Sequence, residues 1–127
     1  MIQNGTLLNV IDNSGAKTVA CIKVGKGFKR RYAASGDIIV VSIKTLRAKR
    51  RSTLKILKGD VCKALVVRCK SVKLSNFGLS LSFFENSVVL LTRQNKFLFT
   101  RIFGPIPSFF RYTKYMRIVT MSSGIVS

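Results

Sequence analysis

Short runs of β-branched and other apolar residues recur along most of the chain, and each run is bounded by Gly, Asn, Asp or Ser. Residues 18–24 show this pattern clearly, because Ala20, Ile22 and Val24 occupy alternate positions. Successive side chains of a strand point to opposite faces, so the spacing predicts a β-strand. Many such segments at near-regular spacing predict an antiparallel barrel or a sandwich.

The turn residues divide the chain into a series of expected elements. A nearly continuous apolar segment, residues 37–44, predicts a strand covered on both faces. Residues 104–107 are expected to break the sheet, and a weaker pattern predicts a short helix over residues 108–115. The other predicted strands are residues 7–11, 18–24, 61–72, 79–83, 87–92, 97–103 and 116–121, with turns at residues 12–15 and 93–96.

The length favours one domain, residues 1–127. Within it we expect a β-barrel over residues 1–104 and a helix and strand extension over residues 105–127. Closure into a barrel would remove the exposed strand edges that promote aggregation.

Charge limits what such a domain can do. The chain has 23 Lys and Arg residues, 4 acids and no His, a formal net charge of +19. Because 47% of the residues are hydrophobic, this charge decorates a real core and is not part of a disordered tail. A surface of this kind requires a polyanion, and nucleic acid is the leading candidate.

The same composition argues against catalysis and against bound metal. General acid–base chemistry lacks its usual residue, His, and the acids are scattered along the chain at Asp12, Asp37, Asp60 and Glu85. Asp37 and Asp60 each follow Gly at a strand start, so we expect them to fix turns or to pair with Arg. No enzyme activity, cofactor or metal is predicted.

The three cysteines, Cys21, Cys62 and Cys69, contain no C-x-x-C pair. They are expected to be small apolar fillers in a reducing compartment. The longest apolar run, residues 38–43, is far too short to span a membrane, so no membrane partner is expected. Residues 1–16 resemble neither a signal nor a transit peptide, which predicts a protein made where it works or already processed.

The cations gather in three groups: a Gly-bearing loop at residues 25–31, a connection at residues 47–58, and the strand at residues 61–72. A solvated loop kept polar for solubility is the alternative for each group. Phe28 and Tyr32 are candidates for stacking on bases, whereas Phe83, Phe84, Phe97 and Phe99 are expected to pack in the core. The candidate nucleic-acid contacts are Lys17, Lys26, Lys29, Arg30, Arg31, Arg47, Lys49, Arg50, Arg51, Lys55, Lys58, Lys63, Arg68 and Lys70.

Specific strings then point to a family. The strings occur in order as Asp12-Asn13-Ser14-Gly15-Ala16, Cys21-Ile22-Lys23-Val24, Lys29-Arg30-Arg31-Tyr32-Ala33, Gly36-Asp37-Ile38-Ile39, Lys58-Gly59-Asp60-Val61 and Thr100-Arg101-Ile102-Phe103-Gly104-Pro105. Together they closely resemble the family of large-subunit ribosomal protein fourteen, in its bacterial and organellar form. The resemblance runs from Met1 to about Met121.

This resemblance implies a small closed five-stranded β-barrel with a short helical C-terminal region. It also implies a structural role that binds large-subunit rRNA near the subunit interface, with neighbouring ribosomal proteins and a bridge to small-subunit rRNA. A ribosome-silencing factor would dock at the positions matching Thr100, Arg101 and Arg117.

The chain departs from the family pattern in four places, the last of which is its C-terminal end at residues 122–127. An Asp-Gly hairpin turn is replaced by Phe77-Gly78, and the connection at residues 47–57 is longer by about four residues and lacks a Pro-Arg-Gly. The third departure introduces Phe109 and Phe110, which either contact an additional protein or cap the barrel.

Two alternatives stay open. The first is a free-standing single-strand RNA-binding barrel or translation factor, which needs aromatic side chains along one strand face. The second concerns location: the departures and the abundance of Phe, Ile, Lys and Ser favour a mitochondrial ribosome in the matrix, with a plastid or a bacterial cytoplasm second.

Overall fold

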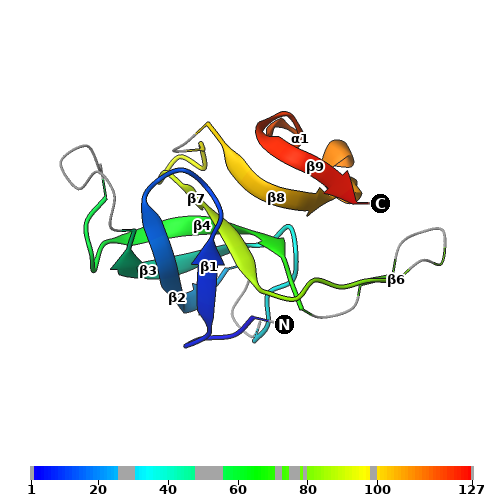
Figure 1. The fold of residues 1–127 in the computed structure, drawn as a ribbon. Helices are drawn as coiled ribbons and strands as arrows, with labels where there is room; N and C mark the ends of the chain where they lie inside the picture. The colour runs from blue at the N-terminus through cyan, green and yellow to red at the C-terminus, as the bar shows by residue number, and fades with distance from the viewer. Residues whose placement is uncertain are drawn as a thin grey trace.

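The computed structural model describes residues 2–25, 31–47, 56–70, 73–74, 78, 80–97 and 100–126. Within this part of the chain, five strands close into a barrel, which confirms the predicted five-stranded fold (Figure 1). In order around the barrel they are β1 (Leu7–Val10), β2 (Ala16–Val24), β3 (Ile38–Leu46), β4 (Val61–Arg68) and β7 (Ser87–Leu91).

One pair of neighbouring strands departs from the expected antiparallel arrangement. β1 and β7 run parallel, with Asn9 opposite Ser87 and Val10 opposite Val88. The other four pairs around the barrel are antiparallel. The parallel pair joins the first and the last strand of the barrel and thereby closes it.

Acidic side chains fix the turns that lead into the strands. The Asp12 carboxylate accepts hydrogen bonds from the Ser14 N–H (3.0 Å) and from the Leu90 N–H (2.9 Å), so it also ties the β1–β2 turn to β7. Before β3 and β4, Asp37 accepts from the Ala34 N–H (2.9 Å) and Asp60 from the Leu57 N–H (2.8 Å). These bonds confirm the predicted turn role of both acids.

The barrel has a core inside and a second core outside. Alternate residues of β4 and β7 supply both, because successive side chains point to opposite faces. Ala64 and Val66 of β4 point into the barrel, whereas Leu65 and Val67 pack on the outer core. The apolar runs of these strands thus reflect coverage on both faces.

The prediction that residues 37–44 are covered on both faces is wrong. In β3 the buried residues Ile39, Val41 and Ile43 alternate with partly exposed ones, so only the inner face is fully covered. The apolar residues on the outer face, Ile38 and Val40, line a cleft that is described below.

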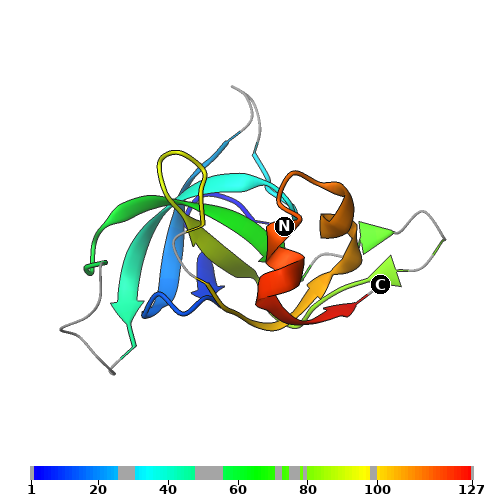
Figure 2. The same ribbon diagram turned by 90° about the horizontal axis from the view of Figure 1, so that it is seen from above.

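The outer core lies beneath a C-terminal lobe, which covers one side of the barrel (Figures 1 and 2). β8 (Ile102–Pro107) and β9 (Ser122–Val126) pair in parallel, and between them lie the 3-10 helix η2 (Ser108–Tyr112) and the helix α1 (Arg117–Met121). Phe110 and Ile118 are completely buried against the barrel.

Three predictions for this lobe need correction. Residues 104–107 continue β8 and do not break the sheet, and the predicted helix over residues 108–115 is a shorter 3-10 helix. The predicted strand over residues 116–121 is helix α1, although Ile118 and Val119 favour strands. Packing decided the outcome, because one helical turn places both Tyr115 and Ile118 on the outer core.

The remaining segments form short pairings. β5 (Lys73–Leu74) and β6 (Ser80–Leu81) make a two-stranded sheet on an arm that extends from the barrel (Figure 1). The predicted strand over residues 61–72 ends earlier than expected, because β4 stops at Arg68. Of the predicted strand over residues 79–83, the structure has the two residues of β6.

The predicted turn at residues 93–96 is present. Asn95 has a positive φ of 61° and its N–H donates to the Thr92 carbonyl (3.0 Å). Of the predicted return strand over residues 97–103, Phe97 forms a bridge with Leu91 and residues 102–103 belong to β8, whereas residues 98–99 lie outside the described part.

Candidate nucleic-acid interface

All four acids of the chain lie in the described residues, and each has a partner within the fold. Asp12, Asp37 and Asp60 accept the backbone hydrogen bonds given above. Glu85 accepts hydrogen bonds from the Asn9 amide (2.9 Å) and the Ser87 hydroxyl (3.0 Å), and lies 2.9 Å from the Arg68 guanidinium. The acids therefore serve the scaffold, and the surface charge is left strongly positive.

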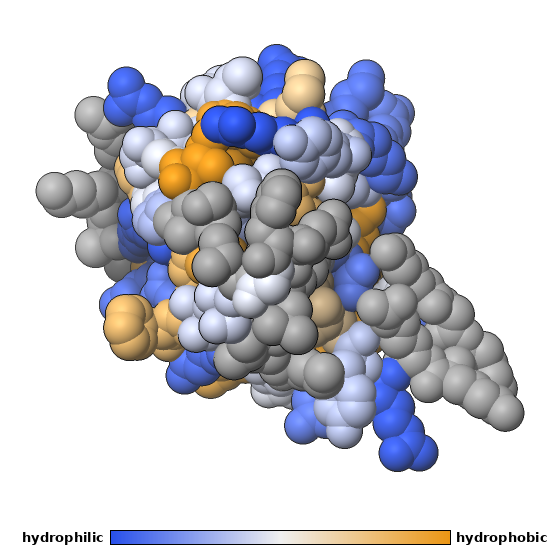
Figure 3. Space-filling view, turned by 90° about the vertical axis from the view of Figure 1, so that its right-hand side faces the viewer, coloured by the Kyte–Doolittle hydropathy of each residue, from blue (hydrophilic) through white to orange (hydrophobic). Residues whose placement is uncertain are grey.

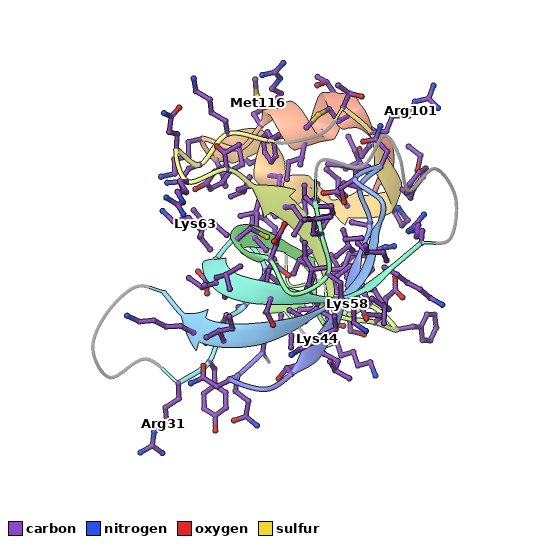
Figure 4. The ribbon with its side chains drawn as sticks, turned by 90° about the vertical axis from the view of Figure 1, so that its left-hand side faces the viewer. Arg31, Lys44, Lys58, Lys63, Arg101 and Met116 are labelled. Atoms are coloured by element: carbon purple, nitrogen blue, oxygen red, sulfur yellow. The ribbon has the colours of Figure 1, made fainter. Side chains whose placement is uncertain are left out.

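One end of the barrel gathers four exposed cations, Lys17, Lys44, Arg47 and Lys58, which we call the basic end. The Gly59 N–H donates to the Ile43 carbonyl (2.8 Å), which brings Lys58 beside Lys44 (Figure 4). The Arg47 N–H donates to the Gly15 carbonyl (2.7 Å), so the start of β2 and the end of β3 meet here. Backbone pairing thus assembles cations from three separate segments.

Arg47 is more tightly held than the lysines of the basic end. Its guanidinium donates to the Val10 carbonyl (3.2 Å) and lies 5.4 Å from the centre of the Phe103 ring. The two contacts fix the direction of the charge toward β8. Such preorganisation reduces the side-chain entropy lost when an anion binds.

The other predicted contacts are distributed around the barrel. Arg31 is exposed and lies far from Lys44 and Lys58 (Figure 4). Lys70 is exposed, and its backbone N–H donates to the Asn86 side chain (2.9 Å). Lys63 is half-buried beside the turn after β7. Lys26, Lys29, Arg30, Lys49, Arg50, Arg51 and Lys55 lie outside the described residues.

Arg68 differs from the other predicted contacts. Its side chain is only 12% exposed and its charge is paired with Glu85. A register shift between Val66 and Arg68 at the end of β4 accompanies this placement. The geometry gives Arg68 a role in joining segments of the fold.

The predicted partner surface is divided between exposed and buried residues. Thr100, Arg101 and Arg117 are exposed. Phe110 is 0% exposed and stacks on the half-buried Phe109 at 4.3 Å. Phe110 therefore caps the outer core, and the structure contradicts its assignment to a docking surface.

The aromatic predictions are corrected at Phe84, which is fully exposed, at 101%, and does not pack in the core. Tyr32, a predicted stacking residue, is 47% exposed. Phe28 and Phe99 lie outside the described residues. On the face shown in Figure 3, hydrophilic residues (blue) lie around the outline, and hydrophobic surface (orange) gathers toward the top.

The sequence patterns missed four exposed lysines among the described residues: Lys23, Lys44, Lys96 and Lys114. Each stands alone between apolar or polar residues, so a search for runs of charge overlooks it. Strand alternation could have found Lys44, because the buried positions 39, 41 and 43 leave position 44 on the outer face.

The cysteines behave as the apolar fillers that were predicted. Burial, and secondarily the charges of Asp12 and Asp60, raise the pKa of the Cys62 thiol to about 11. Burial also raises the pKa of Cys21, which is part of the inner core. Both thiols are therefore protonated and unreactive at neutral pH.

Within the described ranges, no three His, Cys, Asp or Glu side chains come together in a way that could hold a metal ion. No helix in this part of the chain has the length and apolar character needed to cross a membrane.

A closed five-stranded barrel with paired acids and exposed cations places the chain in the class of small basic β-barrel proteins. The family model for ribosomal protein L14p/L23e matches residues 1–126, and the chain belongs to that family. It is therefore a structural constituent of the large ribosomal subunit that acts in translation, and not an enzyme.

Proposed function

We propose that the chain binds large-subunit rRNA through the basic end, together with the basic segments at residues 26–31 and 47–55. The observation that carries the proposal is the engagement of all four acids within the fold. Four cations from three segments then converge where the two nearby acids, Asp12 and Asp60, already accept backbone hydrogen bonds, and phosphates are the matching charge for the excess of cations.

The experiment compares large subunits assembled with the wild-type chain and large subunits assembled with the double variant Lys44→Ala, Lys58→Ala. Hydroxyl-radical footprinting of the rRNA should show one defined protected region that weakens in the variant. Protection that does not change in the variant, or that is spread over unpaired RNA, would contradict the proposal.

We further propose that the chain lies near the subunit interface and contributes to a bridge with small-subunit rRNA. The support is the family membership together with the exposed cations at more than one side of the barrel. Crosslinking within whole ribosomes should join the chain to small-subunit RNA, and dissociating the subunits should abolish that crosslink.

The exposed residues Thr100, Arg101 and Arg117 support a docking surface for a ribosome-silencing factor. Arg101→Glu should weaken capture of such a factor by purified large subunits. Retention of full binding by that variant would remove Arg101 from the surface.

A mitochondrial location is our proposal for the ribosome that contains this chain. Its support is the composition, rich in Phe, Ile, Lys and Ser, and the departures from the family pattern. Fractionation of cells followed by detection of the chain in mitochondrial, plastid or cytoplasmic ribosomes tests it directly.

The free-standing single-strand-binding barrel has less support. That mode needs aromatic side chains on one strand face. The most exposed aromatic residues in the described part, Phe84 and Tyr112, lie outside the barrel strands.

A further inference from the structure

A cleft of about 510 Å³ opens between the outer face of the barrel and the C-terminal lobe. Its walls come from Gly25 after β2, from β3 and Gly36 just before it, from β4, from the turn after β7, and from the segment between η2 and α1. A second hollow adjoins it and shares Asn95, Lys114 and Tyr115. The size is within the range of clefts that hold small organic ligands.

Two lysines bring positive charge to this cleft, and its described lining residues include no acid. The Lys63 ammonium donates to the Arg93 carbonyl and to the Asn95 side-chain oxygen, both at 3.4 Å. These distances are long for hydrogen bonds, so an anion could replace either acceptor. Lys114 supplies the second charge from the opposite wall.

Tyr115 is the most informative residue of the cleft. The residue lines both hollows and is 8% exposed, and its hydroxyl is buried without a hydrogen-bond partner among the described residues. An unpaired buried hydroxyl is destabilising, and native folds rarely keep one without a reason. Because the hydroxyl has almost no accessible surface, Tyr115 can contact a ligand in the cleft through its ring and not through this group.

The surrounding contacts hold Tyr115 in place. The Phe97 ring meets it edge to face, with centroids 6.3 Å apart, and its backbone N–H donates to the Thr113 hydroxyl (3.2 Å). The Lys114 ammonium lies 5.3 Å from the centre of the Tyr115 ring. The aromatic wall and the charge therefore form one rigid unit.

The opposite wall is apolar and comes from Ile38 and Val40 of β3, which Gly25 approaches closely. A Cβ at Gly25 would lie 2.8 Å from the Ile38 carbonyl oxygen, so only glycine fits there without a shift. A flat group could thus insert between this wall and Tyr115 while its anionic part meets the lysines.

We propose that the cleft receives a single unpaired nucleotide of RNA. Its base would lie between the apolar wall and the Tyr115 ring, and its phosphate would lie between Lys63 and Lys114. Proteins recognise unpaired bases splayed from RNA by such contact with aromatic side chains. An acidic protein segment is less suited, because carboxylate side chains carry no flat group for the apolar walls to cover.

This inference rests on the proposed rRNA binding, and the test separates the two. Large subunits carrying the wild-type chain are irradiated with short-wavelength ultraviolet light, and peptides bearing one nucleotide are identified by mass spectrometry. We expect an adduct at Tyr115. Lys63→Ala combined with Lys114→Ala should lower its yield about tenfold, because two charge-assisted contacts are lost.

The matched control is Arg111→Ala, which removes an exposed cation of η2 that does not line the cleft. Its adduct yield at Tyr115 should equal that of the wild type. A second readout uses the free chain: Tyr115→Phe should keep or raise its melting temperature, because the unpaired hydroxyl is removed.

The outcomes are distinct. A wild-type chain that does not associate with rRNA overturns both proposals. A chain that is footprinted on rRNA but gives no nucleotide adduct at Tyr115 overturns only the nucleotide site. A carbodiimide crosslink from Lys114 to a carboxylate of a neighbouring protein in the same particles would also overturn only the nucleotide site.

Discussion

The guanidinium of Arg68, at the end of β4, lies 2.9 Å from the carboxylate of Glu85, just before β7. Glu85 also accepts from Asn9 of β1, so the pair connects three barrel strands at the parallel seam. On the other side of Arg68 lies Gly104 of β8, where an added Cβ would be 2.6 Å from a guanidinium nitrogen. The ion pair therefore also touches the C-terminal lobe.

Glu85→Gln is expected to destabilise the fold. The amide group would face the donors that now bind a carboxylate, and the mostly buried Arg68 would lose its counter-charge. We expect the free energy of unfolding, from urea denaturation, to fall by about 1–2 kcal/mol. The control Asp60→Asn removes the same charge, yet its side-chain oxygen still accepts from Leu57, so a change of under about 0.5 kcal/mol is expected.

Gly104→Ala should be more damaging than Gly59→Ala. Both positions have a positive φ, +83° and +91°, so both variants carry the backbone strain, about 1 kcal/mol. Only at position 104 does the new methyl group meet the Arg68 guanidinium, whereas nothing lies within 4 Å of it at position 59. Equal losses of melting temperature in the two variants would show that Arg68 moves aside without cost.

Asp12 should give the fold a measurable pH dependence. Burial raises the pKa of its carboxyl above 3.8, although hydrogen bonds from Ser14 and Leu90 oppose the shift. Because the folded state then binds a proton more readily than the unfolded state, stability falls as the pH rises from about 3.8 through the raised pKa. Asp12→Asn should remove this contribution.

The Asp12→Asn variant should also be less stable at every pH, by about 1–3 kcal/mol, because its amide cannot accept from both backbone N–H groups. Urea denaturation at a series of acidic pH values measures both effects. An unchanged slope of stability against pH in the variant would mean that Asp12 does not titrate as its burial indicates.

Lys58→Ala should weaken RNA binding without affecting the fold. Lys58 is exposed at the basic end, so its loss should reduce the negative slope of log affinity against log salt by about one, as expected for one phosphate contact. Binding of the chain to large-subunit rRNA fragments at several salt concentrations gives this slope. Arg111→Ala serves as the control. If the slope for the Lys58 variant equals that of the wild type, then Lys58 does not contact a phosphate.

The barrel strands could be predicted because their alternation directly reflects an inside and an outside. The strings shared with the family then gave the number of strands, which alternation alone does not supply. The C-terminal lobe was harder. At residues 117–121 the strand preference of Ile and Val conflicts with the helical turn that buries Ile118, and only tertiary packing decides between them.

The candidate interface was predictable where charge is clustered and missed where backbone pairing assembles it. Lys44 and Lys58 are far apart in sequence and adjacent through the bond from Gly59 to Ile43. Arg68 shows the reverse, since its position in a basic strand gave no hint of the pairing with Glu85. The cleft beside Tyr115 had no sequence signal, because its walls come from five separate segments.

The parallel seam between β1 and β7 also constrains how the chain folds while it is being made. β1 is the first barrel strand to be synthesised and β7 is the last, so their pairing is the most distant in sequence within the barrel. Contacts of this kind form late because they close long loops. A nascent fragment that stops short of Ser87 therefore keeps two open edges, on β1 and β4, however well its first four strands have paired.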